Sequence, residues 1–309
     1  MATIIGTPWE DVPLFGTDDG DWIEGRDGDD QLFGWGGNDV LLGGDGFDYI
    51  LAGDGNDFVD GGADLDYILL DAGSDVGFGG FGDDFIFGGE GSDTLEGGLG
   101  DDYMDGGSGS DWVSYYEAVG PVRVDLTIQG VVQNTGDGFD TLVNVENLEG
   151  SFFPDVLIGN QIANWFFGYG GDDKILGFDG NDVIDGGDGL DTIAGGVGAD
   201  RIIGGGGNDD FVYTSAAESS STSFDTIVDG VWNNGDVFDI PLAVTSFVTL
   251  AGGKLDAARS TPTSARRRSW SLDARRCSRP APARSPASTS SSSMLTGSQV
   301  TRRDRISSS

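Results

Sequence analysis

The sequence contains no histidine and only one cysteine, Cys277, among its 309 residues. Without histidine there can be no Ser-His-Asp triad, no imidazole general base and no His-ligated zinc. A single cysteine cannot form an intrachain disulfide. No apolar run approaches the ~20 residues of a membrane-spanning helix. The N-terminal residues also lack the basic and long apolar regions of a secretory signal peptide.

Positive charge is also scarce. The chain has 16 Lys and Arg residues against 53 Asp and Glu, a formal net charge of −37, and only 4 of the basic residues fall within residues 1–253. This argues against nucleic-acid binding, because phosphate backbones are bound by Lys and Arg. The 55 glycines argue against an ordinary helical or α/β globule. A hydrophobic content of 37% is nevertheless too high for a purely solvated acidic coil.

The glycines and aspartates belong to a nine-residue repeat, GGxGxDxUx, in which U is apolar. Eleven units follow one another over residues 16–114, and seven more cover residues 150–212. The eighth place of the first block is apolar except at Gly77, and the sixth place of the second block is Asp except at Asn164. The predicted metal ligands are the sixth-place aspartates: Asp21, Asp30, Asp39, Asp48, Asp57, Asp66, Asp75, Asp84, Asp93, Asp102, Asp111, Asp155, Asp173, Asp182, Asp191, Asp200 and Asp209.

This spacing predicts a strand and a turn in every unit. The last three places alternate as a minimal strand whose apolar residue points to one face. The first six places are turn chemistry, in which glycine accepts positive φ and lets backbone approach a bound ion. Two units then complete one coil, so that Asp48 lies under Asp66. The expected fold is all-β: a right-handed parallel β-roll, or β-solenoid, in two blocks with a strand-rich spacer and a C-terminal cap.

Stacked carboxylates and carbonyls are hard oxygen ligands, and the metal that they favour is Ca²⁺, which takes 6–8 oxygens in flexible geometry. Mg²⁺ demands a tighter octahedron, and soft metals prefer Cys or His. Two alternatives are a flexible linker and a calcium-free solenoid. The in-phase apolar place argues against the linker. Repulsion between aspartates stacked at the roughly 4.8 Å coil spacing argues against an ion-free solenoid.

The repeat resembles the RTX (haemolysin-type) calcium-binding nonapeptide repeat family. The resemblance implies a protein with several Ca²⁺ ions as cofactors that folds outside the cell after type I secretion. We expect it not to be an enzyme, because no segment outside the repeats is long enough to supply a catalytic domain. The resemblance favours a structural, adhesive or surface-interaction scaffold whose partners include calcium ions and a cell-surface or matrix polysaccharide or protein. The alternative is a calcium-dependent accessory module for the folding or secretion of an RTX exoenzyme whose catalytic domain this chain lacks.

Composition and period divide the chain into six expected segments. The segment after the second block contains Asp225 and Asp229, for which two interpretations stay open, further calcium ligands or solvated surface residues. The spacer contains GDGFDTLV, a repeat-like stretch that is out of register with the blocks. The expected segments are an N-terminal cap (1–15), roll block 1 (16–114), the spacer (115–149), roll block 2 (150–212), a C-terminal cap (213–253) and a tail (254–309).

The tail changes character, with 12 basic and 3 acidic residues and many Ser, Pro and Ala. One interpretation is a basic, disordered arm. We favour a second, in which a frameshift near residue 259 scrambles an ordered ending. Read in the frame offset by two bases, residues 284–306 permit LAGQHFLVVDANG, which resembles the C-terminal ending of many RTX proteins. In that family the C-terminus carries the uncleaved export signal, so a frameshift in this segment would disrupt the signal for export.

Overall fold

The computed structural model describes residues 1–239, apart from residue 12 and the short segments 216–217, 220–222 and 229–234. Within this range all regular structure is extended except one 3-10 turn, η1 (Leu126–Ile128). Asp229, the part of the expected cap after residue 239, and the tail 254–309 lie outside the described residues.

The strands of the first block and of the N-terminal segment alternate along the chain. They are β1 (Thr3–Ile5), β2 (Leu14–Phe15), β3 (Trp22–Asp27), β4 (Gln31–Gly36), β5 (Val40–Asp45), β6 (Tyr49–Asp54), β7 (Phe58–Ala63), β8 (Tyr67–Gly73), β9 (Val76–Phe81), β10 (Phe85–Gly91), β11 (Thr94–Leu99), β12 (Tyr103–Gly109) and β13 (Trp112–Ser114).

The spacer and the second block continue the series with shorter strands. They are β14 (Arg123–Asp125), β15 (Gln133–Asn134), β16 (Phe139–Val143), β17 (Asn147–Glu149), β18 (Val156–Ile158), β19 (Trp165–Phe167), β20 (Lys174–Leu176), β21 (Val183–Asp185), β22 (Thr192–Ala194), β23 (Arg201–Ile203), β24 (Asp210–Val212), β25 (Thr226–Ile227) and β26 (Val237–Asp239).

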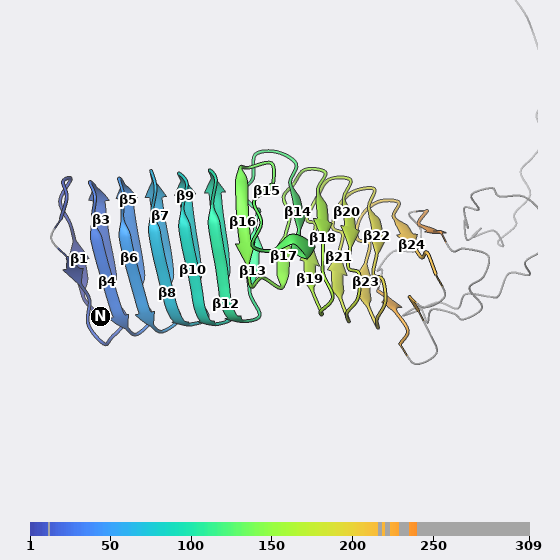
Figure 1. The fold of residues 1–309 in the computed structure, drawn as a ribbon, viewed down its shortest axis with the longest axis horizontal. Coiled ribbons are helices and arrows are strands. Elements are labelled where there is room, and N and C mark those ends of the chain that lie inside the picture. The colour runs from blue at the N-terminus through green and yellow to red at the C-terminus, as the bar shows by residue number, and fades with distance from the viewer. Residues whose placement is uncertain (12, 216–217, 220–222, 229–234, 240–309) are drawn as a thin grey trace, which may run out of the picture. The chain divides into compact units, whose positions relative to one another are not determined.

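The strands form a parallel β-roll, which confirms the predicted fold. Consecutive strands lie on opposite walls, and each strand pairs with the one two units later, as Ile50 does with Ile68. Odd-numbered strands from β1 to β13, followed by the odd-numbered strands from β17 to β25, make one 12-stranded sheet. The even-numbered strands make an 8-stranded sheet, which also includes β15 paired antiparallel with β16, and a 6-stranded sheet. Figure 1 shows the coils stacked side by side along one axis, each two repeats long.

Strand length differs between the two blocks. The prediction of a three-residue strand is correct for the second block, but in the first block most strands have six residues and some seven. There the pairing continues past the apolar place into the glycines of the next unit, as in Gly44 with Gly62. In the second block the same places form only isolated bridges, such as that between Gly170 and Asp188.

The core is a single file of apolar side chains from the eighth places, which point inward from both walls. Ile50, Ile68 and Ile86 are fully buried. The exception in the repeat, Gly77, is compensated from the opposite wall. A methyl group on Gly77 would lie 3.1 Å from the side chain of Leu70, which is fully buried and stands where most units have glycine.

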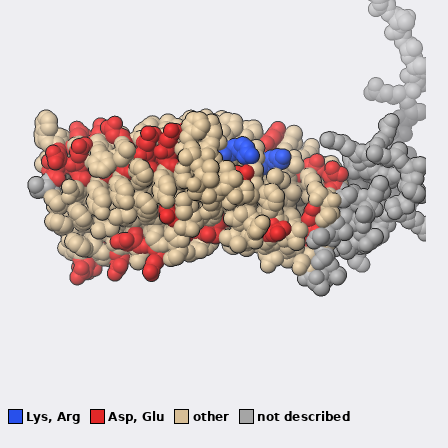
Figure 2. Space-filling model, viewed as in Figure 1, with Lys and Arg blue, Asp and Glu red and all other residues tan. Residues whose placement is uncertain are grey.

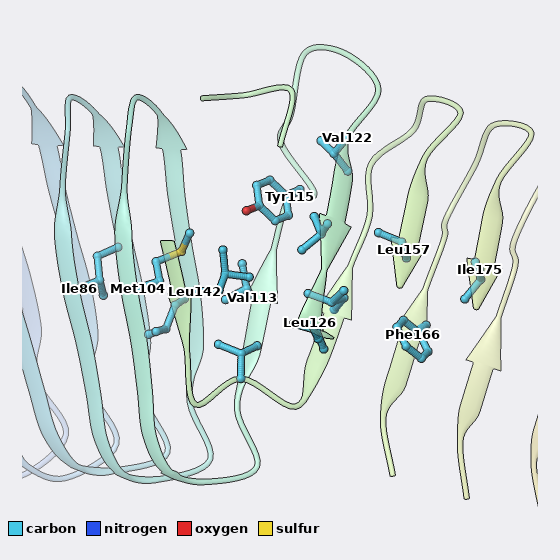
Figure 3. Packing of buried hydrophobic residues seen from close by; sticks show 14 of the residues in the cluster. Ile86, Met104, Val113, Tyr115, Val122, Leu126, Leu142, Leu157, Phe166 and Ile175 are labelled. Atoms are coloured by element: carbon cyan, nitrogen blue, oxygen red, sulfur yellow. The ribbon is translucent and has the colours of Figure 1, made fainter. Parts of the chain in front are cut away.

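The spacer belongs to the roll rather than covering it. Its repeat-like stretch forms β16, in which Thr141 pairs with Tyr103 of β12. Leu142 is fully buried in the core, and Figure 3 shows it beside Met104 and Val113. β17 joins the 12-stranded sheet, which therefore runs unbroken from the first block into the second. The out-of-period part of the spacer also contributes to the core, through Val122, Val124 and Leu126.

The N-terminal residues also enter the stack. β1 pairs with β3 in a register of 19 residues, Thr3 opposite Trp22, and β2 pairs with β4 in the ordinary register of 18, Leu14 opposite Leu32. Residues 1–15 therefore form a first coil with one additional residue. Figure 2 shows acidic side chains gathered along the edges of the first block, and basic side chains near the middle of the roll.

Candidate calcium-binding turns

All seventeen predicted ligands are buried, with exposed fractions of 3% or less. The roll stacks them in ladders, because each backbone N–H bonds to the side chain of the sixth-place residue one coil later. The Asp48 N–H donates to Asp66 Oδ1 at 2.8 Å, and the Asp66 N–H donates to Asp84 Oδ1 at 2.8 Å. The expectation that Asp48 lies under Asp66 is therefore correct, and the bond occupies one oxygen of each carboxylate.

The second oxygen, Oδ2, faces the turn and in most units has no hydrogen-bond donor. Burying a carboxylate oxygen without a donor or a cation is costly. Such atoms rarely persist unless something else neutralises them. Fourteen of the predicted ligands have an unpartnered Oδ2: Asp30, Asp39, Asp48, Asp57, Asp66, Asp75, Asp84, Asp93, Asp102, Asp111, Asp173, Asp182, Asp191 and Asp200.

Glycine shapes the space into which these oxygens point. A methyl group on Gly25 would lie 2.5 Å from Asp30 Oδ2 and 2.7 Å from the carbonyl oxygen of Gly43. Both oxygens therefore border the same small space, from which every side chain is excluded. The second and fourth places bend the turn, as shown by φ of +123° at Gly44 and +126° at Gly46. L-residues seldom adopt such angles.

Burial makes the carboxylates hard to ionise when no cation is bound. Desolvation, followed by repulsion from neighbouring aspartates, raises the pKa of Asp66, Asp102 and Asp173 to about 8. Desolvation likewise raises the pKa of Asp48 to about 7. A divalent cation at the turns would offset the desolvation and repulsion, and its binding would release protons.

The donor set fits calcium. The groups that border the space at Gly25 are the Oδ2 atom of Asp30 and the carbonyl oxygen of Gly43, and a hard cation prefers such oxygen ligands. Among the described residues no three Asp, Glu, His or Cys side chains cluster as a metal centre. An ion in these turns would therefore be held by few carboxylate oxygens, the Oδ2 atoms of the ladder, together with backbone carbonyls of the glycine-rich turns.

Asp21 and Asp155 lie in the ladders but differ from the other predicted ligands. Asp21 Oδ2 accepts from the backbone N–H of Thr17 at 2.7 Å and from its hydroxyl at 2.8 Å. Asp155 Oδ2 accepts from the N–H of Ser151 at 2.6 Å and from its hydroxyl at 3.0 Å. In both units a hydroxyl residue replaces the second-place glycine, so protein donors occupy the oxygen that elsewhere faces the turn unbonded.

The structure adds two spacer residues to the ladders. Asp140 Oδ1 accepts from the Asp102 N–H at 3.2 Å, and Glu146 Oε2 accepts from the Asp111 N–H at 2.9 Å. Hydroxyls satisfy Asp140 Oδ2: Tyr115 at 2.9 Å and Thr135 at 2.7 Å. The GDGFD spacing at 136–140 could have placed Asp140. Glu146 has no sequence signal, since neither glycine nor Asp marks its unit.

Beyond the second block, two more aspartates continue the ladders. Asp225 Oδ1 accepts from the Asp200 N–H at 3.1 Å, and Asp236 Oδ1 accepts from the Asp209 N–H at 3.1 Å. Asp225 is the candidate named from the sequence. Asp236 was missed because its unit carries no GxGxD spacing, although Gly235 directly precedes it.

The class of protein defined by this fold and these turns is a calcium-binding β-roll. The family model for the RTX calcium-binding nonapeptide repeat matches residues 15–50, 42–76, 78–113, 149–177, 158–193 and 185–213, together more than half of the chain. The chain belongs to this RTX repeat family. A search of curated proteins finds no match. In the part of the chain that the structure describes, no helix has the length and apolar character needed to span a bilayer.

Proposed function

We propose that this chain is a secreted protein that folds when calcium binds outside the cell, and that its ordered roll serves as an extracellular structural or adhesive scaffold. The observation that supports this best is the ladder of buried Oδ2 atoms with no hydrogen-bond donor. The backbone bonds of the roll bring these carboxylates together, and their charge opposes the same arrangement until a cation is present.

The negative charge of the roll also supports calcium-dependent folding. Residues 1–253 contain 50 acidic and 4 basic residues. Self-repulsion of this size disfavours a compact state, and a core that receives mainly one apolar side chain from each wall per coil offers limited hydrophobic compensation. Binding of calcium and folding then become one event. Extracellular calcium modules commonly bind at about 10⁻⁴–10⁻³ M, so the chain would remain unfolded in a low-calcium cytosol and fold after export.

Circular dichroism of the full chain at pH 7 tests the folding step. Millimolar Ca²⁺ should produce the β-sheet signal, excess chelator should abolish it, and the same concentration of Mg²⁺ should restore much less. A β-sheet signal that chelator does not diminish would overturn calcium-dependent folding.

Export and adhesion need separate measurements. When the codons after residue 259 are restored to the offset reading frame, co-expression with a type I exporter should place the chain in the medium. Retention of that restored chain in the cell would contradict secretion without affecting the folding result. Calcium-dependent retention of the folded chain on cell surfaces or matrix would support a scaffold. Equal retention in calcium and in chelator would contradict it.

A further inference from the structure

A groove lies along the 12-stranded sheet of the first block, and its lining includes second-place glycines of the turns, Gly44, Gly62 and Gly80. Its volume is about 650 Å³, within the range of small-molecule sites. It crosses β5, β7, β9 and β11, and the spacer contributes Glu117, Val119 and Asp137 to its lining. Four coils at the roughly 4.8 Å strand spacing extend over about 14 Å, so the groove suits an elongated ligand.

The lining is aromatic and apolar over much of this length. Phe58, Phe78 and Phe81 line it, with Leu99 and Val119 beside them. The rings of Phe58 and Phe78 are 5.5 Å apart, and Phe81 is 64% exposed. Glycines at the second place of each unit, such as Gly62 and Gly80, leave the backbone open to close approach.

The charges that line the groove all have one sign. Five carboxylates are spread along it, on Asp45, Asp60, Glu96, Glu117 and Asp137, and no Lys or Arg is among its lining residues. Glu96 is only 8% exposed. Desolvation, and then the charge of Glu117, raises the pKa of Asp60, and desolvation also raises the pKa of Glu96 and Asp137. The groove is therefore an apolar trough with uncompensated negative charge.

We propose that this groove binds a linear organic polycation of the polyamine class. The methylene segments of such a molecule would cover the phenylalanine rings and Leu99, and its ammonium groups would meet the spaced carboxylates. Cations are attracted to aromatic faces and to desolvated carboxylates, so both features of the lining favour the same ligand. A bare metal ion fits less well, because it would leave the aromatic and apolar length of the groove uncovered.

Isothermal titration of the calcium-saturated full chain with spermine tests the proposal. Saturable binding of one spermine per chain is expected, with putrescine weaker because it is too short to reach carboxylates across four coils. Glu117→Gln, which neutralises an exposed carboxylate of the groove, should weaken binding by up to about fivefold. Phe81→Ala should weaken it without changing the charge.

Two matched controls lie outside the groove: Asp18→Asn for the charge and Phe47→Ala for the ring. Both residues are exposed and absent from the lining. Unchanged affinity in these variants supports the site. Equal losses in the control and groove variants, or binding that never saturates near one per chain, would overturn it as a general attraction of polycations to an acidic surface. Calcium-dependent folding is read by circular dichroism, so its failure is distinguishable from failure of this site.

Discussion

Asp66→Asn should change the stability of the roll in opposite directions with and without calcium. Asp66 lies in the middle of a ladder, is fully buried, and has one oxygen bonded to the Asp48 N–H at 2.8 Å. Its other oxygen has no hydrogen-bond donor. Asparagine keeps the acceptor for the Asp48 N–H and removes the charge, but it replaces the oxygen that would meet the ion with an amide.

The size of the effect without calcium follows from the pKa. Burial raises the pKa of Asp66 from 3.8 to about 8. At pH 7 the folded, calcium-free roll therefore keeps this group protonated, at a cost that grows by 1.36 kcal/mol per pKa unit above 3.8. The total is at most about 4 kcal/mol at pH 7. Asparagine removes this cost, so the variant should hold more β-structure in chelator than the parent does.

In calcium the same change removes a ligand. The calcium concentration at the folding midpoint should rise and the number of bound ions should fall, both measurable by titration followed with circular dichroism and by equilibrium dialysis. Asp21→Asn is the matched control, because Thr17 donors occupy the second oxygen of Asp21. The number of bound ions should remain unchanged in that variant. If Asp66→Asn leaves calcium binding intact, or destabilises the calcium-free chain, the reasoning is wrong.

Three further predictions concern pH, turn strain and core packing. Because the folded pKa of the ladder aspartates is raised, the calcium-free roll binds more protons than the unfolded chain. Its β-sheet signal in chelator should be largest near pH 4 and be lost as pH rises through about 6 to 8. Calcium affinity should increase over the same pH interval. A β-sheet signal that grows with pH in chelator would contradict this prediction. Asp64 has φ of +75° at a fourth place that is usually glycine. Asp64→Gly should therefore stabilise the calcium-bound roll by about 1 kcal/mol, seen as a higher Tm. Asp18→Gly is the control and should give no such gain, because φ is not positive at Asp18. Leu70→Gly should lower the free energy of unfolding by about 2–5 kcal/mol, because it opens a cavity beside Gly77. The double variant with Gly77→Val should recover much of that loss, and denaturant unfolding in calcium measures both variants. Additive effects would show that the two sites are independent and would contradict this reasoning.

Much of the candidate site could be predicted because the repeat is local and periodic. A constant nine-residue spacing forces sixth-place residues one coil apart to stack, and the apolar eighth place follows from strand alternation. Positions that depart from the period were harder to predict. Glu146 enters the ladder through the path of the spacer, and Leu70 fills the space at Gly77 from the opposite wall. Neither relation has a fixed sequence separation that a period could reveal.

The sequence alone determines the parallel roll, the hard oxygen ligands of the turns and the preference for calcium, because each follows from residue types at a fixed interval. Only the tertiary structure decided which carboxylates keep an unbonded oxygen. Thr17 and Ser151 occupy that atom in Asp21 and Asp155, and Tyr115 and Thr135 occupy it in Asp140. The groove across four coils is likewise tertiary, since its lining residues are distant in sequence and come together only when the coils stack.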